Sequence, residues 1–322
     1  MIKKHFLLML AISIMSQGVV SQNRIPEVRF NVPLDSIRLS DPFIFTHKKT
    51  QMYYMTGTGG LLWKSPDLRY WNGPFRVVKH DPDSWMGHDP MIWAAEIHEY
   101  KGKYYFFGTF TNRDVKIDTV RGNVIERRAC HILVSDKPDG PYVPMADQEY
   151  LPANMPTLDN TLWIEDGIPY MLYCYEWLQN WDGTIEKIQL KPDLSGSVGE
   201  SVLLFKSSDS PWSKERDETG EIIFNKVTDG PWVFKTATGR LGMLWTSWIF
   251  DVYTQGVAYS ESGKLIGPWI HEEKPITPPN FGHGMMFNPH CSYPSIMIWQ
   301  SDLSFFKISP VCHTDFFRGN GI

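Results

Sequence analysis

Four acidic residues, far apart in the chain, each stand at or near the start of an apolar run typical of a β-strand: Asp41, Glu96, Asp159 and Asp229. Carboxylates that face one another repel, so gathering them in one pocket raises the pKa of at least one. A protonated carboxyl can donate its proton to a leaving oxygen, while an ionised one activates water or attacks carbon. Hydrolysis of a glycosidic bond needs this division of roles.

The acids belong to a unit that recurs about every 50 to 70 residues, a spacing typical of propeller blades. Each unit has an apolar run, a polar turn rich in Gly, Lys or Asp, and further apolar runs closed by Pro, Asp and Gly. Helical periodicity is weak throughout, so the repeats predict an all-β fold, a five-bladed β-propeller. The fifth unit starts at Gly282, and residues 288–294 lack the expected charged turn. Whether the fifth blade is complete is therefore left open.

The first strand of every propeller blade lines the central channel. Residues near the starts of these strands should therefore converge although they are distant in sequence. On this basis we expect five side chains to approach one axis: Asp41, Glu96, Asp159, Asp229 and His283.

Composition excludes some functions and favours others. The chain has 322 residues, 42% of them hydrophobic and 21% charged, and a net charge of −5, which gives no electrostatic footprint for nucleic acid. Aromatic residues make up 14% of the chain, and flat rings with one polar edge suit stacking on sugars. The candidates for substrate contact are Trp85, Trp93, Trp177 and Trp248, with His88, Asp89 and Glu96 for polar contacts.

The N-terminus predicts export. Lys3 and Lys4 precede an apolar run from Phe6 to Met15 that is too short to span a bilayer, and Val19-Val20-Ser21 is a plausible cleavage site. We therefore expect a signal peptide at 1–21 and one catalytic domain at 22–322 in a secreted or periplasmic protein without membrane insertion. The four cysteines have no Cys-x-x-Cys spacing, so a zinc site is not expected.

Taken together, several motifs resemble glycoside hydrolase family 43. They are Asp41-Pro42, the stretch from Trp93 to Glu96, Asp159 before a strand, and Asp229-Gly230-Pro231, and the resemblance spans about residues 37–287. It implies a five-bladed propeller in which Asp41 is the general base and Asp159 orients the acid and tunes its pKa. It also implies the general acid at position 229. His283, in Gly-His-Gly, matches a channel histidine that often touches a bound calcium or its waters.

The chain departs from the family pattern at the acid. The family usually has Glu before Gly-Pro, whereas this chain has Asp229, one methylene shorter. A carboxyl displaced by about 1 Å matters for proton transfer. Glu176 is the second candidate, because it follows an apolar run beside Tyr175 and Trp177, where partial desolvation would raise its pKa.

The resemblance predicts an exo-acting, inverting hydrolase of terminal α-L-arabinofuranosyl residues, with β-xylosyl or galactofuranosyl residues as alternatives. Its partner would be an oligo- or polysaccharide, no cofactor would be required, and a structural calcium in the central channel is a further expectation. We expect a monomer. Two rival hypotheses remain: a non-catalytic carbohydrate-binding propeller, and a glycoside phosphorylase on the same fold, which would need basic side chains to hold phosphate.

Overall fold

The computed structural model describes residues 27–145, 149–290, 296–301 and 306–310. The predicted signal peptide lies outside this range, as does most of the C-terminal tail. Within it the protein is all-β, as predicted, apart from the single helical turn α1 (Trp177–Asn180) and the 3₁₀ turns η1 (Leu34–Ser36) and η2 (Ser207–Asp209). No helix among these residues is long and apolar enough to cross a membrane.

The first two sheets follow each other in the chain. The first has the strand order β1-β5-β4-β3-β2 and the second β6-β7-β8-β9. The first contains β1 (Arg29–Pro33), β2 (Phe43–His47), β3 (Met52–Thr56), β4 (Leu61–Ser65) and β5 (Tyr70–Arg76). The second contains β6 (Met91–Tyr100), β7 (Lys103–Val120), β8 (Asn123–Ser135) and β9 (Val143–Pro144).

The third sheet runs β10-β11-β12-β13, and a larger sheet follows it with the order β16-β17-β18-β20-β21-β22 and β19 paired to β18. The third sheet contains β10 (Thr157–Glu165), β11 (Ile168–Tyr175), β12 (Thr184–Leu190) and β13 (Ser197–Lys206). A small hairpin, β14 (Glu215–Arg216) with β15 (Ile222–Ile223), precedes β16 (Asp229–Lys235), β17 (Leu241–Ile249), β18 (Val252–Ser260) and β19 (Trp269–His271). The last strands are β20 (Phe281–Phe287), β21 (Ile296–Ser301) and β22 (Phe306–Pro310).

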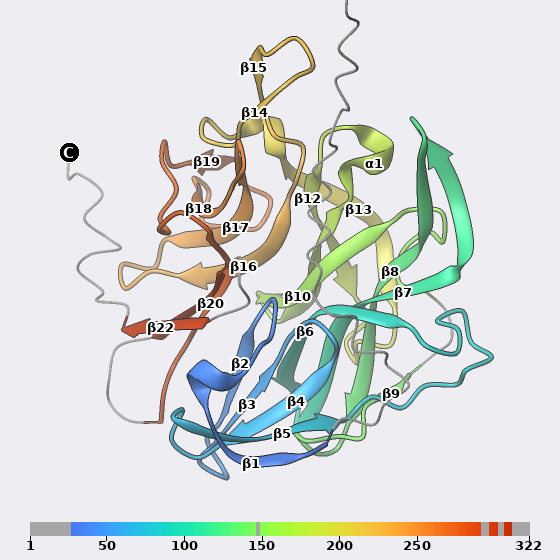
Figure 1. Ribbon diagram of the computed structural model, residues 1–322, viewed down its shortest axis with the longest axis vertical. Helices are drawn as coiled ribbons and strands as arrows, with labels where there is room; N and C mark the ends of the chain where they lie inside the picture. Colours follow the sequence, from blue (N-terminus) through green and yellow to red (C-terminus); the bar gives the residue numbers. More distant parts are fainter. Residues whose placement is uncertain (1–26, 146–148, 291–295, 302–305, 311–322) are drawn as a thin grey trace, which may run out of the picture.

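The sheets form a propeller. Strands β2, β6, β10, β16 and β20 contact one another in a closed ring, and Figure 1 shows these strands around the centre with their sheets radiating outward. Four blades are distinct sheets, whereas β20 joins the fourth through a single parallel pair, Thr254 with Phe281. Large aromatic side chains, among them Trp71, Phe106 and Trp245, are fully buried in the cores between sheets. Each contributes about 1.5–3 kcal/mol by leaving water.

Every strand of the central ring carries the same irregularity near its start. One residue has a left-handed backbone, with φ of 54° at Asp41, 41° at Ala94, 57° at Asp159, 51° at Gly230 and 46° at His283. In four of the strands the pairing register also shifts across this residue, which marks a β-bulge. Bulges re-aim side chains, and here they turn the residues at this level toward the channel.

Hydrogen bonds from main-chain N–H groups tie these bulges to earlier strands. In three cases the N–H of the left-handed residue donates to the hydroxyl of a threonine that lies just after β3, in β7 or in β17. The bonds run from Ala94 to Thr58 (3.0 Å), from Asp159 to Thr109 (2.9 Å) and from His283 to Thr246 (2.9 Å). The ring is thus held in register where the predicted site residues lie.

Candidate active site

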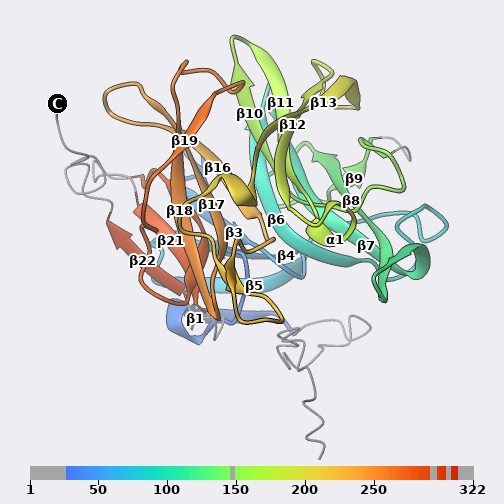
Figure 2. The ribbon, with the colours of Figure 1, turned by 90° about the horizontal axis from the view of Figure 1, so that it is seen from above.

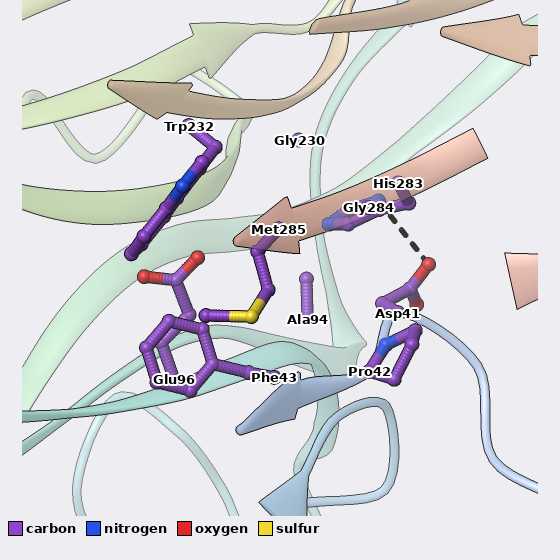
Figure 3. Close-up of a pocket in the computed structure, with 10 residues that line it drawn as sticks. All are labelled: Asp41, Pro42, Phe43, Ala94, Glu96, Gly230, Trp232, His283, Gly284 and Met285. Carbon is purple, nitrogen blue, oxygen red and sulfur yellow. Dashed lines mark ion pairs between the residues drawn. The ribbon is translucent and has the colours of Figure 1, made fainter. Parts of the chain in front are cut away.

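His283 stands between two of the predicted acids. Its Nδ1 lies 3.2 Å from Oδ1 of Asp41 and 3.9 Å from Oδ2 of Asp159, and all three side chains are largely buried. Figure 3 shows the ring of His283 facing Asp41 across the channel. The hydroxyl of Thr58 donates to Oδ2 of Asp41. Both oxygens of Asp41 are therefore positioned by neighbours from other parts of the ring.

Asp159 is buried, and its Oδ2 accepts a 3.0 Å hydrogen bond from the main-chain N–H of Gly230. The pKa of Asp159 is raised well above its ordinary value, first by burial and then by the charge of Asp41. The Gly230 N–H opposes this rise in pKa because it stabilises the ionised form. Gly230 is therefore the one bulge residue of the ring whose N–H bonds to a carboxylate rather than to a threonine.

Asp229, the first residue of β16, is partly buried beside the same group. The Tyr253 hydroxyl donates to its Oδ2 at 3.2 Å, and the ring of Tyr253 packs 4.9 Å from the ring of Trp248. The pKa of Asp229 is raised well above its ordinary value, chiefly by burial and next by the charge of Asp159, while His283 and Tyr253 act in the opposite direction. Three predicted acids thus meet around His283, each with different partners.

Glu176, the alternative proton donor, has a different environment. Its Oε2 lies 2.5 Å from Nη1 of Arg128, and the guanidinium of Arg128 sits 4.0 Å from the centroid of the Trp93 ring. Nε of Arg128 also donates to Thr111 at 3.2 Å. Glu176 is close enough to Asp159 to raise the pKa of that carboxyl. Glu176 and Trp93 are therefore joined by one arginine at the edge of the acid cluster.

A pocket opens beside His283. Ten residues line it: Asp41, Pro42, Phe43, Ala94, Glu96, Gly230, Trp232, His283, Gly284 and Met285. None of these is Lys or Arg, so the pocket itself holds no permanent cation to bind phosphate.

Glu96 does not occupy the position expected for it. It lies within β6, and Ala94 takes the bulge position that Asp41 and Asp159 fill in other strands. The side chain of Glu96 lies near Trp232 (Figure 3). Its Oε2 is 2.7 Å from Nε2 of His98. β6 begins at Met91, so Glu96 is its sixth residue rather than one near its start, but it still lines the pocket together with Asp41 and His283.

The remaining candidates lie apart from this pocket. His88 and Asp89 are exposed in the loop before β6. Trp177 begins α1, and its ring lies 5.3 Å from that of Trp181. Trp85 is buried in a core cluster with its ring 5.6 Å from His131, so it offers no face to a sugar.

Residues 30–289 match the sequence model of Glycosyl hydrolases family 43. The chain belongs to family 43. This confirms the resemblance found in the motifs and makes the protein a glycoside hydrolase. No curated protein matches the chain in sequence.

Solved structures of similar proteins agree with the family. An endo-arabinase from Bacteroides thetaiotaomicron VPI-5482 is 34% identical, with a TM-score of 0.75, and the match covers 88% of this chain and 97% of that one. An endo-1,4-beta-xylanase from the same organism (20% identity, TM-score 0.60, 88% and 97% coverage) and an alpha-L-arabinofuranosidase from Lactobacillus brevis (18%, 0.60, 87% and 94%) share the fold.

The expectation that this family 43 protein binds a structural calcium rests on His283. In the described part of the chain, no group of three or more His, Cys, Asp or Glu side chains could hold a metal ion. Calcium takes six to eight oxygen ligands, and Nδ1 of His283 is directed at Asp41 instead. The described residues do not by themselves fit a calcium cage, so no chemical step below uses a metal.

Sequence reasoning missed three residues of this family 43 site: Thr58, Arg128 and Tyr253. Each reaches an acid across at least 17 positions of sequence, which a linear motif cannot reveal. A signal was available for Thr58, because Thr58, Thr109 and Thr246 stand at equivalent points of their repeats. Aligning the repeats on the left-handed residues would have found it.

Proposed function

We propose that this family 43 protein is an exo-acting, inverting hydrolase that removes terminal α-L-arabinofuranosyl residues from oligo- or polysaccharides. The observation that carries the proposal is the meeting of Asp41, Asp159 and Asp229 around His283, each with its own hydrogen-bond partners. Terminal β-xylosyl and galactofuranosyl residues are the alternative substrates.

Asp41 acts as the general base in this proposal. It accepts a hydrogen bond from Thr58 and faces His283, so its oxygens are oriented to accept a proton. An inverting enzyme needs such a base on one face of the sugar, with room for water between base and sugar carbon. The water loses its proton to Asp41 as its oxygen attacks the anomeric carbon.

Asp229 acts as the general acid. Burial and the charge of Asp159 raise its pKa, so its proton is retained at a pH where an ordinary aspartate has lost it. Asp159 modulates this donor through its charge, and its own carboxylate is anchored by the Gly230 N–H. The donated proton leaves on the departing oxygen as the glycosidic bond breaks.

A wall on one side of the site favours exo action. β7 and β8 continue beyond Thr111, which pairs with the first residue of β6, and the hairpin they form reaches α1. At its tip Arg121 stacks 3.8 Å from the centroid of the Trp181 ring, and Asp118 accepts from Gln179 at 3.2 Å. Figure 2 shows this hairpin and α1 on the same side of the propeller. Such a wall would stop a polysaccharide from lying across the site.

Linear arabinan tests the proposal. An exo enzyme releases arabinose from the first minutes, with little fall in viscosity. Early release of mixed oligosaccharides with a rapid fall in viscosity would instead support an endo-arabinanase, the alternative favoured by the 34% identical endo-arabinase. Aryl arabinofuranosides, xylosides and galactofuranosides identify the sugar, and NMR of the first-formed anomer checks inversion.

The two rival hypotheses have their own tests. Phosphate-dependent turnover would indicate a phosphorylase, although the absence of Lys and Arg from the pocket lining argues against it. A melting temperature that rises with sugar while no glycoside is cleaved would indicate a binding protein.

We also propose that β20, β21 and β22 form a fifth blade. Their support is the closed ring of inner strands and the left-handed residue His283, which repeats the pattern of the four preceding strands. Residues 1–21 would be removed on export to the periplasm or the medium, and the mature protein would be a monomer. N-terminal sequencing of the exported protein and sedimentation test these two proposals.

A further inference from the structure

Thr58 lies in a tight segment that follows β3 and touches the start of β2. Its N–H donates to the carbonyl of Ser40 at 2.9 Å. The preceding residue is Gly57, where a Cβ would collide with the carbonyl oxygens of Ser40 and Asp41. The close approach that glycine permits brings the Thr58 side chain against Asp41.

The direction of the Thr58 hydrogen bonds is fixed by its neighbours. A threonine hydroxyl has one proton to donate and two lone pairs that accept. The main-chain N–H of Ala94 donates to Oγ1 of Thr58 at 3.0 Å, so the hydroxyl must accept on that side. Its single proton is then directed to Oδ2 of Asp41. A donor locked toward a carboxylate favours the ionised state of that carboxylate.

We propose that Thr58 is a positioning residue for the general base: its hydroxyl orients Asp41 through Oδ2, so that Oδ1, which also faces Nδ1 of His283 at 3.2 Å, is directed to take the proton of the attacking water. The proposal rests on the proposed function, because it requires Asp41 to be the base. The atoms balance simply: one O–H bond of water breaks, its proton passes to Oδ1, and Thr58 keeps its own proton on Oγ1 throughout.

The chain supplies a matched control for this proposal. Thr246 makes the same bond to the next inner strand, from the N–H of His283 at 2.9 Å, and no carboxylate bonds to its hydroxyl among the described residues. Thr58→Val and Thr246→Val therefore remove equivalent links to an inner strand of the ring. Only the first removes a donor from the base.

The experiment measures kcat and KM on the aryl glycoside that the wild type cleaves best. For Thr58→Val we expect kcat to fall about 10-fold or more, as for loss of a hydrogen bond to a charged group, with KM changed less than about twofold. Thr58→Ser, which keeps the hydroxyl, should stay within about threefold of wild type.

Two outcomes would overturn the proposal: equal losses of kcat in Thr58→Ser and Thr58→Val, or a loss of kcat in Thr246→Val as large as that in Thr58→Val. If Thr58→Val does not fold, Thr58→Ala removes the same hydroxyl without the branched methyl group, and the comparison with Thr58→Ser stands. A wild type without any glycosidase activity would refute the proposed function itself. An active wild type with a normal Thr58→Val variant would refute only the role of Thr58.

Discussion

Nη1 of Arg128 lies 2.5 Å from Oε2 of Glu176. The same guanidinium covers one face of Trp93, so one cation engages a predicted acid and a predicted sugar platform together. A carboxylate whose oxygen is engaged by a permanent cation is less free to approach a departing oxygen. Asp229, with burial and Asp159 raising its pKa, suits the task better.

Replacing each candidate in turn shows whether Asp229 or Glu176 is the general acid. A substrate with a very good leaving group needs little protonation, so loss of the true acid harms poor leaving groups most. We expect Asp229→Asn to lower kcat/KM about 100-fold or more on a poor leaving group and far less on a good one. Glu176→Gln should lower both by the same modest factor. If Glu176→Gln rather than Asp229→Asn harms poor leaving groups most, Glu176 is the general acid instead.

Asp41→Asn should abolish hydrolysis of every substrate while the protein stays folded. The amide keeps the size of the side chain but cannot accept the proton of water, and good leaving groups should not rescue it. Turnover is measured with aryl glycosides, and the melting temperature serves as the control. A variant with wild-type activity would remove Asp41 from the mechanism.

The raised pKa of Asp229 also predicts that this residue lowers the stability of the folded protein while it serves catalysis. A carboxyl whose folded pKa lies above its unfolded value favours folding at low pH, and this contribution is lost as pH rises through the folded pKa. At neutral pH this carboxyl therefore costs stability, because folding must either take up a proton or bury the charge. Asp229→Asn should raise the melting temperature at pH 7 by roughly 2 °C or more, and the gain should vanish below about pH 4, near the unfolded pKa. A gain that persists at low pH would point to packing instead.

Much of the fold was predictable because the repeats are local. Turn residues and strand-like runs recur in order, so an all-β propeller and the convergence of Asp41, Asp159, Asp229 and His283 followed from counting units.

The environment of each acid could not be predicted in the same way. Glu176 resembled a desolvated strand end in sequence, but Arg128 meets it from 48 positions away. The bulges were also hidden, since a left-handed aspartate or histidine carries no local signal comparable to glycine. In β6 the left-handed residue is therefore Ala94, and Glu96 follows it two positions later.

The contact between Arg121 and Trp181 should influence where the enzyme cuts. Arg121→Ala removes a guanidinium 3.8 Å from the ring centroid and loosens the hairpin wall. We expect unchanged kcat/KM on aryl glycosides and a larger share of oligosaccharides among early products from arabinan. Chromatography of products at low conversion measures this share. An unchanged product pattern in a folded variant would show that the hairpin does not limit access.

Gly230 is the ring position where a side chain should be least tolerated. Its φ is 51°, and a Cβ there would lie 2.8 Å from Cδ2 of His283, which is closer than real Cβ atoms approach. Gly230→Ala should therefore push His283 away from Asp41 and disturb the N–H that anchors Asp159. We expect a loss of kcat of about 10-fold or more, of the size that displacing catalytic groups by a fraction of an ångström produces.

Gly239→Ala is the matched control for backbone strain. Gly239 also has a left-handed φ, 84°, but a Cβ there would meet nothing within 4 Å. Both substitutions cost about 1–2 kcal/mol of stability from the disfavoured backbone, so both should lower the melting temperature. Only Gly230→Ala should lower kcat beyond this shared effect. Equal kcat in the two variants would mean that His283 can shift without consequence, and that the close packing of Gly230 on the histidine serves the fold rather than the chemistry.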